Sequence, residues 1–205
     1  MAKKLRGRPA GKSGQAPVLK THEIKRVLKL TKIRARLAAR SELALMFSLY
    51  LGLRAKEIAS LCWGDIYDKD GKVRDLLRLQ AAYTKGAKTR DVFLTAPSLR
   101  QVLIDYEKHY TWWRAPLAPL FRSQKGGNLT AGSMARFLKG LYVEAGIPEA
   151  SSHTGRRTFI TSLAERGIDL KAIAVLAGHS NIRTTALYVD ANPIKLSRIL
   201  SDVAW

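Results

Sequence analysis

The sequence predicts a mainly α-helical domain that carries one small antiparallel β-sheet, an α+β class. Apolar residues recur at helical spacing in most segments between Thr21 and Val203. One stretch, residues 76–95, instead combines extended character with a turn. The chain has 205 residues, of which 46% are hydrophobic, and this is enough for one good-sized domain. We detect no internal repeat.

The helices are predicted from their caps and breakers. Thr21 is expected to be the N-cap of the first helix, with an inner face that runs from Ile24 to Ile33. Ser41 is expected to cap a second, strongly apolar helix over 42–50, which Gly52 ends. Further helices are expected at about 55–61, 97–110, 130–145, 155–166, 170–177, from there to Tyr188, and at 193–203. Pro97 opens the second of these, and Asp169 caps the helix over 170–177. Gly146 and Gly167 end the helices over 130–145 and 155–166.

The sheet is predicted as a hairpin. Residues 76–84 are apolar with a β-branched and aromatic end, Gly86-Ala87 forms a turn, and residues 90–95 alternate in character. Residues 111–129 are rich in proline, glycine and tryptophan and form the longest irregular segment expected.

The charge of the chain points to a polyanionic partner. There are 36 Lys and Arg against 16 Asp and Glu, a formal net charge of +20. Nucleic acid is the leading candidate for that partner. An anionic membrane is the alternative, but it calls for an amphipathic basic helix or a lipidation signal, and neither stands out.

Cysteine usage and hydropathy favour an intracellular, cytoplasmic protein. Cys62 is the single cysteine, so a disulfide within the chain is impossible, and its apolar context predicts a small core residue. The longest apolar run, residues 43–53, is too short to span a bilayer. The basic N-terminus has no apolar segment behind it, unlike a secretory signal.

Residues 1–18 are predicted to be a flexible basic arm that precedes one domain, residues 19–205. Within the arm, Arg6-Gly7-Arg8-Pro9 resembles the core of an AT-hook, whose arginines lie in the narrow minor groove of A·T-rich DNA. The alternative is a basic tail that binds phosphates without sequence preference.

One group of residues carries the chemistry. Arg54 lies far upstream of His153, Arg156, His179 and Tyr188, which follow one another closely. Two arginines, two histidines and a tyrosine are the residue types needed to hold a phosphate diester and to attack it with a phenol.

Four segments resemble motifs of the tyrosine recombinases, the family of phage integrases and of Xer and Cre-type enzymes. Residues 51–58, LGLRAKEI, resemble the first arginine box, and residues 61–66, LCWGDI, resemble its continuation. Residues 153–159, HTGRRTF, resemble the second box, and residues 176–188 contain the GHS, the threonine pair and the tyrosine. The order and spacing match the family, which implies its catalytic-domain fold over roughly residues 20–190.

The resemblance implies a role for each residue of the group. Arg54 and Arg156 would clamp the scissile phosphate, and Tyr188 would attack it to form a 3′-phosphotyrosine. His153 would help manage the tyrosine proton, and His179 would donate a hydrogen bond to a phosphate oxygen.

Supporting roles are implied as well. The proton for the leaving 5′-oxygen would come from Lys85 on the hairpin turn, with Lys88 as the alternative. Glu57 would orient the site, while Lys88 and Arg157 would contact DNA. No metal, cofactor or ATP is implied, since the phosphotyrosine keeps the energy of the broken bond.

The chain departs from the family pattern at Thr154-Gly155, at Ala177 where many members have glycine or leucine, at Asp190 where histidine is common, and in its N-terminal part. Thr154-Gly155 replaces the usual pair inside H-x-x-R, and Gly155 is expected to loosen the turn that aims His153. Most relatives have an N-terminal helical domain of roughly one hundred residues. Here we expect only the arm to precede the catalytic domain, as in the short fimbrial phase-switch recombinases, and we therefore expect weaker, strongly salt-dependent DNA binding.

Three functions follow from the sequence. The first is a site-specific recombinase that integrates, excises or inverts double-stranded DNA as a homotetramer through a Holliday junction, with accessory DNA-bending or directionality factors as further partners. The second is a nick-and-seal enzyme that resembles type IB topoisomerases. The third is a non-catalytic DNA-binding regulator on the same scaffold.

Overall fold

The computed structural model describes residues 15–33, 38–84, 89–110 and 115–188, and it confirms a mainly helical fold with one two-stranded antiparallel sheet. The elements, in chain order, are α1 (Thr21–Ile33), α2 (Ala38–Tyr50), α3 (Ala55–Ser60), α4 (Trp63–Ile66), β1 (Leu76–Leu79), β2 (Arg90–Phe93), α5 (Pro97–His109), α6 (Ala131–Glu144), α7 (Thr154–Glu165), α8 (Leu170–Ala177) and α9 (Arg183–Ala186).

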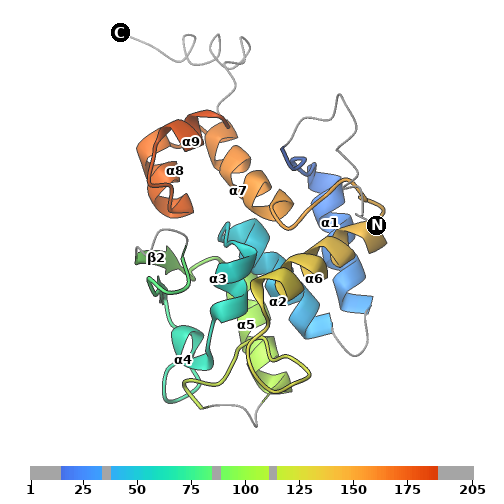
Figure 1. The fold of residues 1–205 in the computed structure, drawn as a ribbon, viewed down its shortest axis with the longest axis vertical. Coiled ribbons are helices and arrows are strands. Elements are labelled where there is room, and N and C mark those ends of the chain that lie inside the picture. The colour runs from blue at the N-terminus through green and yellow to red at the C-terminus, as the bar shows by residue number, and fades with distance from the viewer. Residues whose placement is uncertain (1–14, 34–37, 85–88, 111–114, 189–205) are drawn as a thin grey trace, which may run out of the picture.

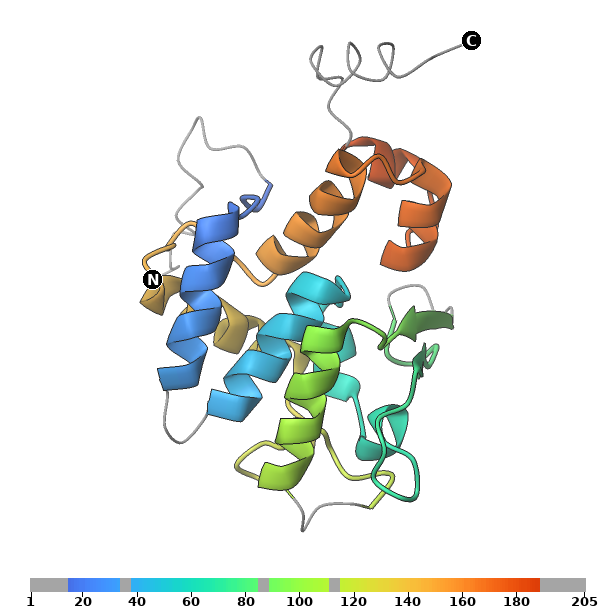
Figure 2. The same cartoon turned by 180° about the vertical axis from the view of Figure 1, so that it is seen from behind.

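Helix α2 is the centre of the fold. Its residues 43–49 are all buried, because the helix is apolar on almost every face and neighbours cover it on all sides. Helices α1, α5 and α7 pack against it, and α3 packs against α6. Figures 1 and 2 show α7, α8 and α9, coloured orange to red, gathered at one end of the molecule beyond α2 and α3.

The first two helices begin differently from the prediction. Thr21 is the first residue of α1 and not its cap, since the carbonyl of Lys20 accepts the first helical hydrogen bonds. The Glu23 carboxylate accepts from the Lys20 N–H at 2.8 Å and completes this start. Ile33, predicted to face inward, is 67% exposed. Ser41 is buried inside α2, which already begins at Ala38, so the predicted cap at Ser41 is wrong.

The hairpin is confirmed, but its first strand is shorter than predicted. Leu76 pairs with Phe93 and Leu79 with Arg90, and beyond Leu79 the chain turns, with N–H groups of residues 83 and 84 bonded to carbonyls three residues back. Gly86-Ala87 lies outside the described residues. Helix α4 was not predicted; the Asp65 carboxylate starts it by accepting from the Cys62 N–H at 2.8 Å.

Several predicted ends are confirmed. Thr130 and Asp169 are the N-caps of α6 and α8. Gly146 and Gly167 have left-handed φ angles of 72° and 80°, and each follows the C-cap residue of its helix, α6 or α7. The helix predicted for 193–203 lies outside the described residues. Cys62 is only partly buried, so the prediction of a core position holds in part. In the described residues we find no helix with the length and apolar character needed to span a membrane.

Candidate active site

The turn between α2 and α3 places Arg54. Gly52 has a φ of +60°, and a Cβ on it would lie 2.5 Å from the Phe159 ring of α7, so this close approach requires glycine. The chain then extends through Leu53 to Arg54, which directly precedes α3. Arg54 therefore lies at the start of α3, and its Nη2 donates to the Gly178 carbonyl after α8 at 3.4 Å.

Glu57 holds Arg54 from within α3. Its Oε1 accepts from Arg54 Nη1 at 2.8 Å, and its Oε2 accepts from the Arg54 backbone N–H at 2.8 Å. The Glu57 side chain is fully buried. Burial opposes its ionisation, but the charges of Arg90 and Arg54 and the backbone hydrogen bond outweigh that cost and lower its pKa. Glu57 therefore holds the Arg54 side chain in place, and its role in orienting the site during a reaction stays a prediction.

Arg90, at the start of β2, is a site residue that the sequence analysis missed. Its Nη2 donates to Glu57 Oε2 at 2.9 Å, and its Nη1 donates to the Leu176 carbonyl at 2.7 Å. Nothing in its sequence context separates it from the other arginines; only the fold brings it beside Glu57.

Arg156 projects from the first turn of α7 and is 7% exposed. Its Nη1 donates to the Gly52 carbonyl at 2.7 Å and its Nη2 to the Ala177 carbonyl at 2.6 Å. Burial, together with the neighbouring charge of Arg54, lowers its pKa to about 9. The guanidinium stays charged at neutral pH, and an anion beside it would relieve the cost of burying that charge.

His179 comes after the end of α8, separated from its last residue only by Gly178, which has a left-handed backbone conformation. Its Nδ1 lies 2.8 Å from Oγ1 of Thr185, a fully buried side chain. Burial lowers the pKa of the imidazole to about 4, and the charges of Arg156, Arg54 and Arg90 act in the same direction. His179 is therefore neutral at pH 7. Thr185 belongs to the threonine pair quoted above, but the sequence alone does not indicate that it contacts His179.

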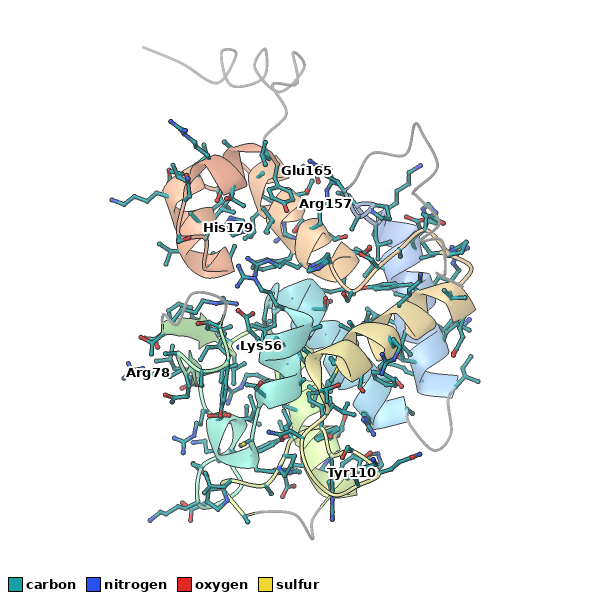
Figure 3. The ribbon with its side chains drawn as sticks, in the orientation of Figure 1. Lys56, Arg78, Tyr110, Arg157, Glu165 and His179 are labelled. Atoms are coloured by element: carbon teal, nitrogen blue, oxygen red, sulfur yellow. The ribbon has the colours of Figure 1, made fainter. Side chains whose placement is uncertain are left out.

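Tyr188 lies between His179 and Arg157. The ring centroid of Tyr188 is 6.3 Å from the ring centroid of His179. The Arg157 Cζ lies 5.8 Å from the Tyr188 ring centroid. The ring packs against the small apolar core that α7 and α8 share. Figure 3 shows His179 and Arg157 within the α7 to α9 group, on its α8 and α7 sides respectively. Ionised Tyr188 would favour the charged form of Arg156, so the phenol is within electrostatic reach of that guanidinium.

The described end of the N-terminal segment contacts the same region. Arg157 Nη1 donates to the Ala16 carbonyl at 2.6 Å, and the Leu19 N–H donates to Thr158 Oγ1 at 3.0 Å. Residues 16 and 17 are partly buried, which differs from the expectation of a free arm as far as residue 18. Arg157 is thus engaged within the protein, and its predicted contact with DNA stays a prediction.

Gly155 does not loosen the start of α7. A Cβ on Gly155 would collide with Oγ of Ser48 in α2 and would lie 2.9 Å from the Tyr142 hydroxyl. Glycine is therefore what lets α7 approach α2 closely, and it tightens this junction. His153, the residue before α7, is exposed, and its backbone N–H donates to Ser151 Oγ at 3.2 Å.

Four predicted site residues lie outside the described part of the chain. They are Arg6 and Arg8 of the arm, and Lys85 and Lys88 of the hairpin turn. Among the described residues, His, Cys, Asp and Glu form no group of three that could hold a metal ion.

The site that remains is a cluster of positive charge beside a phenol. The guanidinium groups of Arg54 and Arg90 pair with the Glu57 carboxylate, the Arg156 guanidinium is within electrostatic reach of it, and the nearby imidazole is neutral. Net positive charge is left, and each guanidinium has donors beyond those already bonded. Chemically, the site can bind a tetrahedral anion and present it to Tyr188.

Comparison with known proteins agrees with this geometry. The model of the phage integrase family matches residues 17–194. The tyrosine recombinase XerD of Oceanobacillus iheyensis is 31% identical over 187 residues, which are 87% of this chain and 59% of that protein. XerC of Rhodospirillum centenum is 32% identical over 151 residues, 70% of this chain and 44% of that protein. The chain thus spans about half the length of the curated relatives that it matches.

Solved structures show the same fold. The XerA recombinase superposes with a TM-score of 0.72 at 22% identity, covering 93% of this chain and 68% of that one. The XerH recombinase in a post-cleavage complex with its difH substrate gives a TM-score of 0.71 at 23% identity. The match covers 93% of this chain and 54% of that one. The family model, the relatives and the shared fold lead to one conclusion: the chain belongs to the phage integrase family, the tyrosine recombinases.

Proposed function

We propose that the protein is a site-specific DNA recombinase in which Tyr188 cuts and rejoins a strand through a 3′-phosphotyrosine. One observation carries the proposal. Arg54 and Arg156 come from segments a hundred residues apart, yet both meet at the α8 end, beside His179 and within electrostatic reach of Tyr188. A structural ion pair needs neither the second arginine nor a phenol next to it.

The chemistry follows from the charges. Arg54 and Arg156 bind the non-bridging oxygens of the phosphodiester, where charge grows in the transition state. Neutral His179 donates one further hydrogen bond. The Tyr188 oxygen forms a bond to phosphorus as the bond from phosphorus to the 5′-oxygen breaks. The phenol loses its proton, for which we propose His153 as the acceptor. The 5′-oxygen gains a proton, for which we propose Lys85 as the donor, with Lys88 as the alternative.

The reverse attack by a 5′-hydroxyl of another strand rejoins DNA and releases Tyr188. We propose a homotetramer on double-stranded DNA that proceeds through a Holliday junction, in the cytoplasm at the nucleoid. Metal and ATP are not needed, because the phosphotyrosine conserves the bond energy. Arg6, Arg8, Lys88 and Arg157 are proposed DNA contacts, and accessory bending or directionality factors are proposed partners.

The covalent intermediate tests the proposal. Duplexes selected for binding from a random pool, nicked at successive positions, are incubated with protein in EDTA and analysed for an SDS-resistant adduct. We expect an adduct with the wild type and none with Tyr188→Phe. Tyr50→Phe, which removes the hydroxyl of a partly exposed tyrosine at the end of α2, is the matched control. Tight DNA binding with no adduct at any nick position would favour a non-catalytic DNA-binding protein.

The same preparation separates recombination from nick-and-seal chemistry. A plasmid with two copies of the selected site should yield recombinant circles. Relaxation of supercoils without recombinant products would instead favour an activity that resembles type IB topoisomerases.

A further inference from the structure

Three arginines meet three consecutive carbonyls at the end of α8. Arg90 donates to Leu176 at 2.7 Å, Arg156 donates to Ala177 at 2.6 Å, and Arg54 donates to Gly178 at 3.4 Å. The last carbonyls of a helix have no intrahelical partners and carry partial negative charge, so guanidinium groups are favourable there. His179 is the next residue, and its position depends on how this helix end is held.

Arg90 differs from the other two arginines in what it connects. Its second nitrogen donates to Glu57 Oε2 at 2.9 Å, and Glu57 in turn holds the Arg54 guanidinium through Oε1. The Arg90 guanidinium therefore links two parts of the site. One is the Glu57 carboxylate, which orients Arg54, and the other is the end of α8, which His179 follows. Arg156 donates only to backbone carbonyls among its described hydrogen bonds.

The packing of Arg90 allows little freedom. Its side chain is 10% exposed. A Cβ on Gly178, whose φ is +66°, would lie 2.5 Å from the Arg90 Cδ, so glycine and arginine fit against each other. Both terminal nitrogens already donate inside the protein, whereas the Arg54 side chain is 24% exposed and can reach a ligand.

We propose that Arg90 is a positioning residue for strand transfer, which holds Glu57 against the end of α8 and so fixes Arg54 relative to His179. The proposal rests on the recombinase function proposed above. Without Arg90, the helix end would depend on Arg54 and Arg156, the two arginines whose donors the phosphate also needs. Loss of Arg90 should therefore slow the chemical step more than it weakens DNA binding.

The variants are Arg90→Lys and Arg90→Met, with Arg78→Met as the matched control. Lysine keeps the charge near Glu57 but has a single nitrogen, so it cannot reproduce the fork. Arg78 lies on β1 of the same sheet and pairs with Asp91 in an exposed ion pair, with side chains 66% and 42% exposed. Its loss removes the same charge from the same hairpin, which controls for general attraction to DNA.

The first measurement needs no DNA. Hydrogen exchange is followed at the Gly178 and His179 amides, which donate to the Val175 and Ala174 carbonyls at 3.0 and 2.9 Å. We expect faster exchange at both amides in Arg90→Lys and Arg90→Met, and unchanged exchange in Arg78→Met, at temperatures where each variant is folded. Wild-type exchange in both Arg90 variants would overturn the proposal.

The second measurement is the rate of adduct formation on a nicked duplex at saturating protein. We expect a decrease of about 10- to 100-fold for Arg90→Lys, as is typical of residues that orient reacting groups. Its DNA affinity should equal that of the wild type, because lysine keeps the charge, and the affinity of Arg90→Met should equal that of Arg78→Met. A wild-type adduct rate in Arg90→Lys would overturn the positioning role, even if exchange at Gly178 had increased.

A substrate with sulfur at the bridging 5′ position separates two causes of slow reaction, because a thiolate leaves without a proton. The defect of Arg90→Lys should persist on it; full recovery would assign Arg90 to the leaving group and overturn the proposal. If the wild type itself forms no adduct, the recombinase function fails, and the exchange measurement still decides whether Arg90 holds the α8 end.

Discussion

The His179 imidazole is held by Thr185: Nδ1 of the histidine lies 2.8 Å from Oγ1 of the threonine. A neutral imidazole has one N–H. We expect the threonine hydroxyl to donate to Nδ1, which leaves the hydrogen on Nε2. Thr185 thereby decides which nitrogen of His179 can donate to a phosphate oxygen.

Replacing Thr185 by valine should slow catalysis while the protein remains folded. The change keeps the shape of the side chain but removes the hydroxyl, so the hydrogen of His179 is no longer directed to Nε2. We expect adduct formation to fall by about 10- to 100-fold. The neighbouring Thr184→Val, on an exposed residue of α9, is the control. Equal adduct rates in the two variants would contradict this role of Thr185.

Stability should depend on the protonation of His179. Its folded pKa, about 4, lies below the value of 6.5 for an unperturbed histidine. Between these two values the unfolded chain binds more protons than the folded chain, so the free energy of unfolding rises with pH. We expect stability to be lost as the pH falls from above 6.5 towards 4. The free energy of unfolding is measured with urea at several pH values in this range. It should change less steeply with pH in His179→Asn than in the wild type, and an identical pH dependence would contradict the assignment.

Gly155→Ala should destabilise the protein. The added methyl group meets Ser48 and the Tyr142 hydroxyl inside the junction of α7 with α2. Overpacking of this kind costs about 1–3 kcal/mol. Gly140→Ala in α6 is the control, because a Cβ there has no neighbour within 4 Å. Alanine at that position should stabilise by about 0.5–1 kcal/mol. Equal melting temperatures for the two variants would be inconsistent with a close contact at Gly155.

Deleting residues 2–14 should weaken DNA binding without lowering the melting temperature. The deletion removes five basic residues but leaves the Ala16 and Leu19 contacts with α7. Each lost phosphate contact should reduce the slope of log K against log salt by about 0.9. Deleting residues 2–19 should additionally destabilise the domain. An unchanged affinity and salt slope in the shorter deletion would exclude a role for the arm.

The sequence predicted the parts of the fold whose signals are local. Asp169 is predicted as a cap, and Thr130 as the start of its helix, because a short polar side chain before an apolar segment is typical of a helix N-terminus. Ser41 has the same local pattern but is itself buried within α2, where packing outweighs a cap. Ile33 continues a helical stripe past the point where other helices cover it. These two predictions fail because tertiary packing decides the outcome, and a short stretch of sequence does not show which other elements will pack against it.

The site divides in the same way. Arg54, Glu57, Arg156, His179 and Tyr188 lie in motifs with defined order, so the sequence indicates them. Arg90 is one of many arginines on this basic chain, and only the fold brings it to Glu57, 33 positions away. Thr185 lies in a quoted motif, but the motif does not indicate its contact with His179, 6 positions away. The role assigned to Gly155 was wrong because its partner Ser48 is more than a hundred residues distant.

The Arg157 hydrogen bond to Ala16 has a consequence for engineering. A single side chain separates the described start of the chain from the Tyr188 ring. A module fused directly to residue 15, in place of residues 1–14, would therefore enter the domain near the tyrosine proposed to cut DNA. A programmable DNA-binding domain attached there through a short linker would deliver its target sequence near that tyrosine, whereas a rigid or bulky fusion would compete with the substrate for the same space.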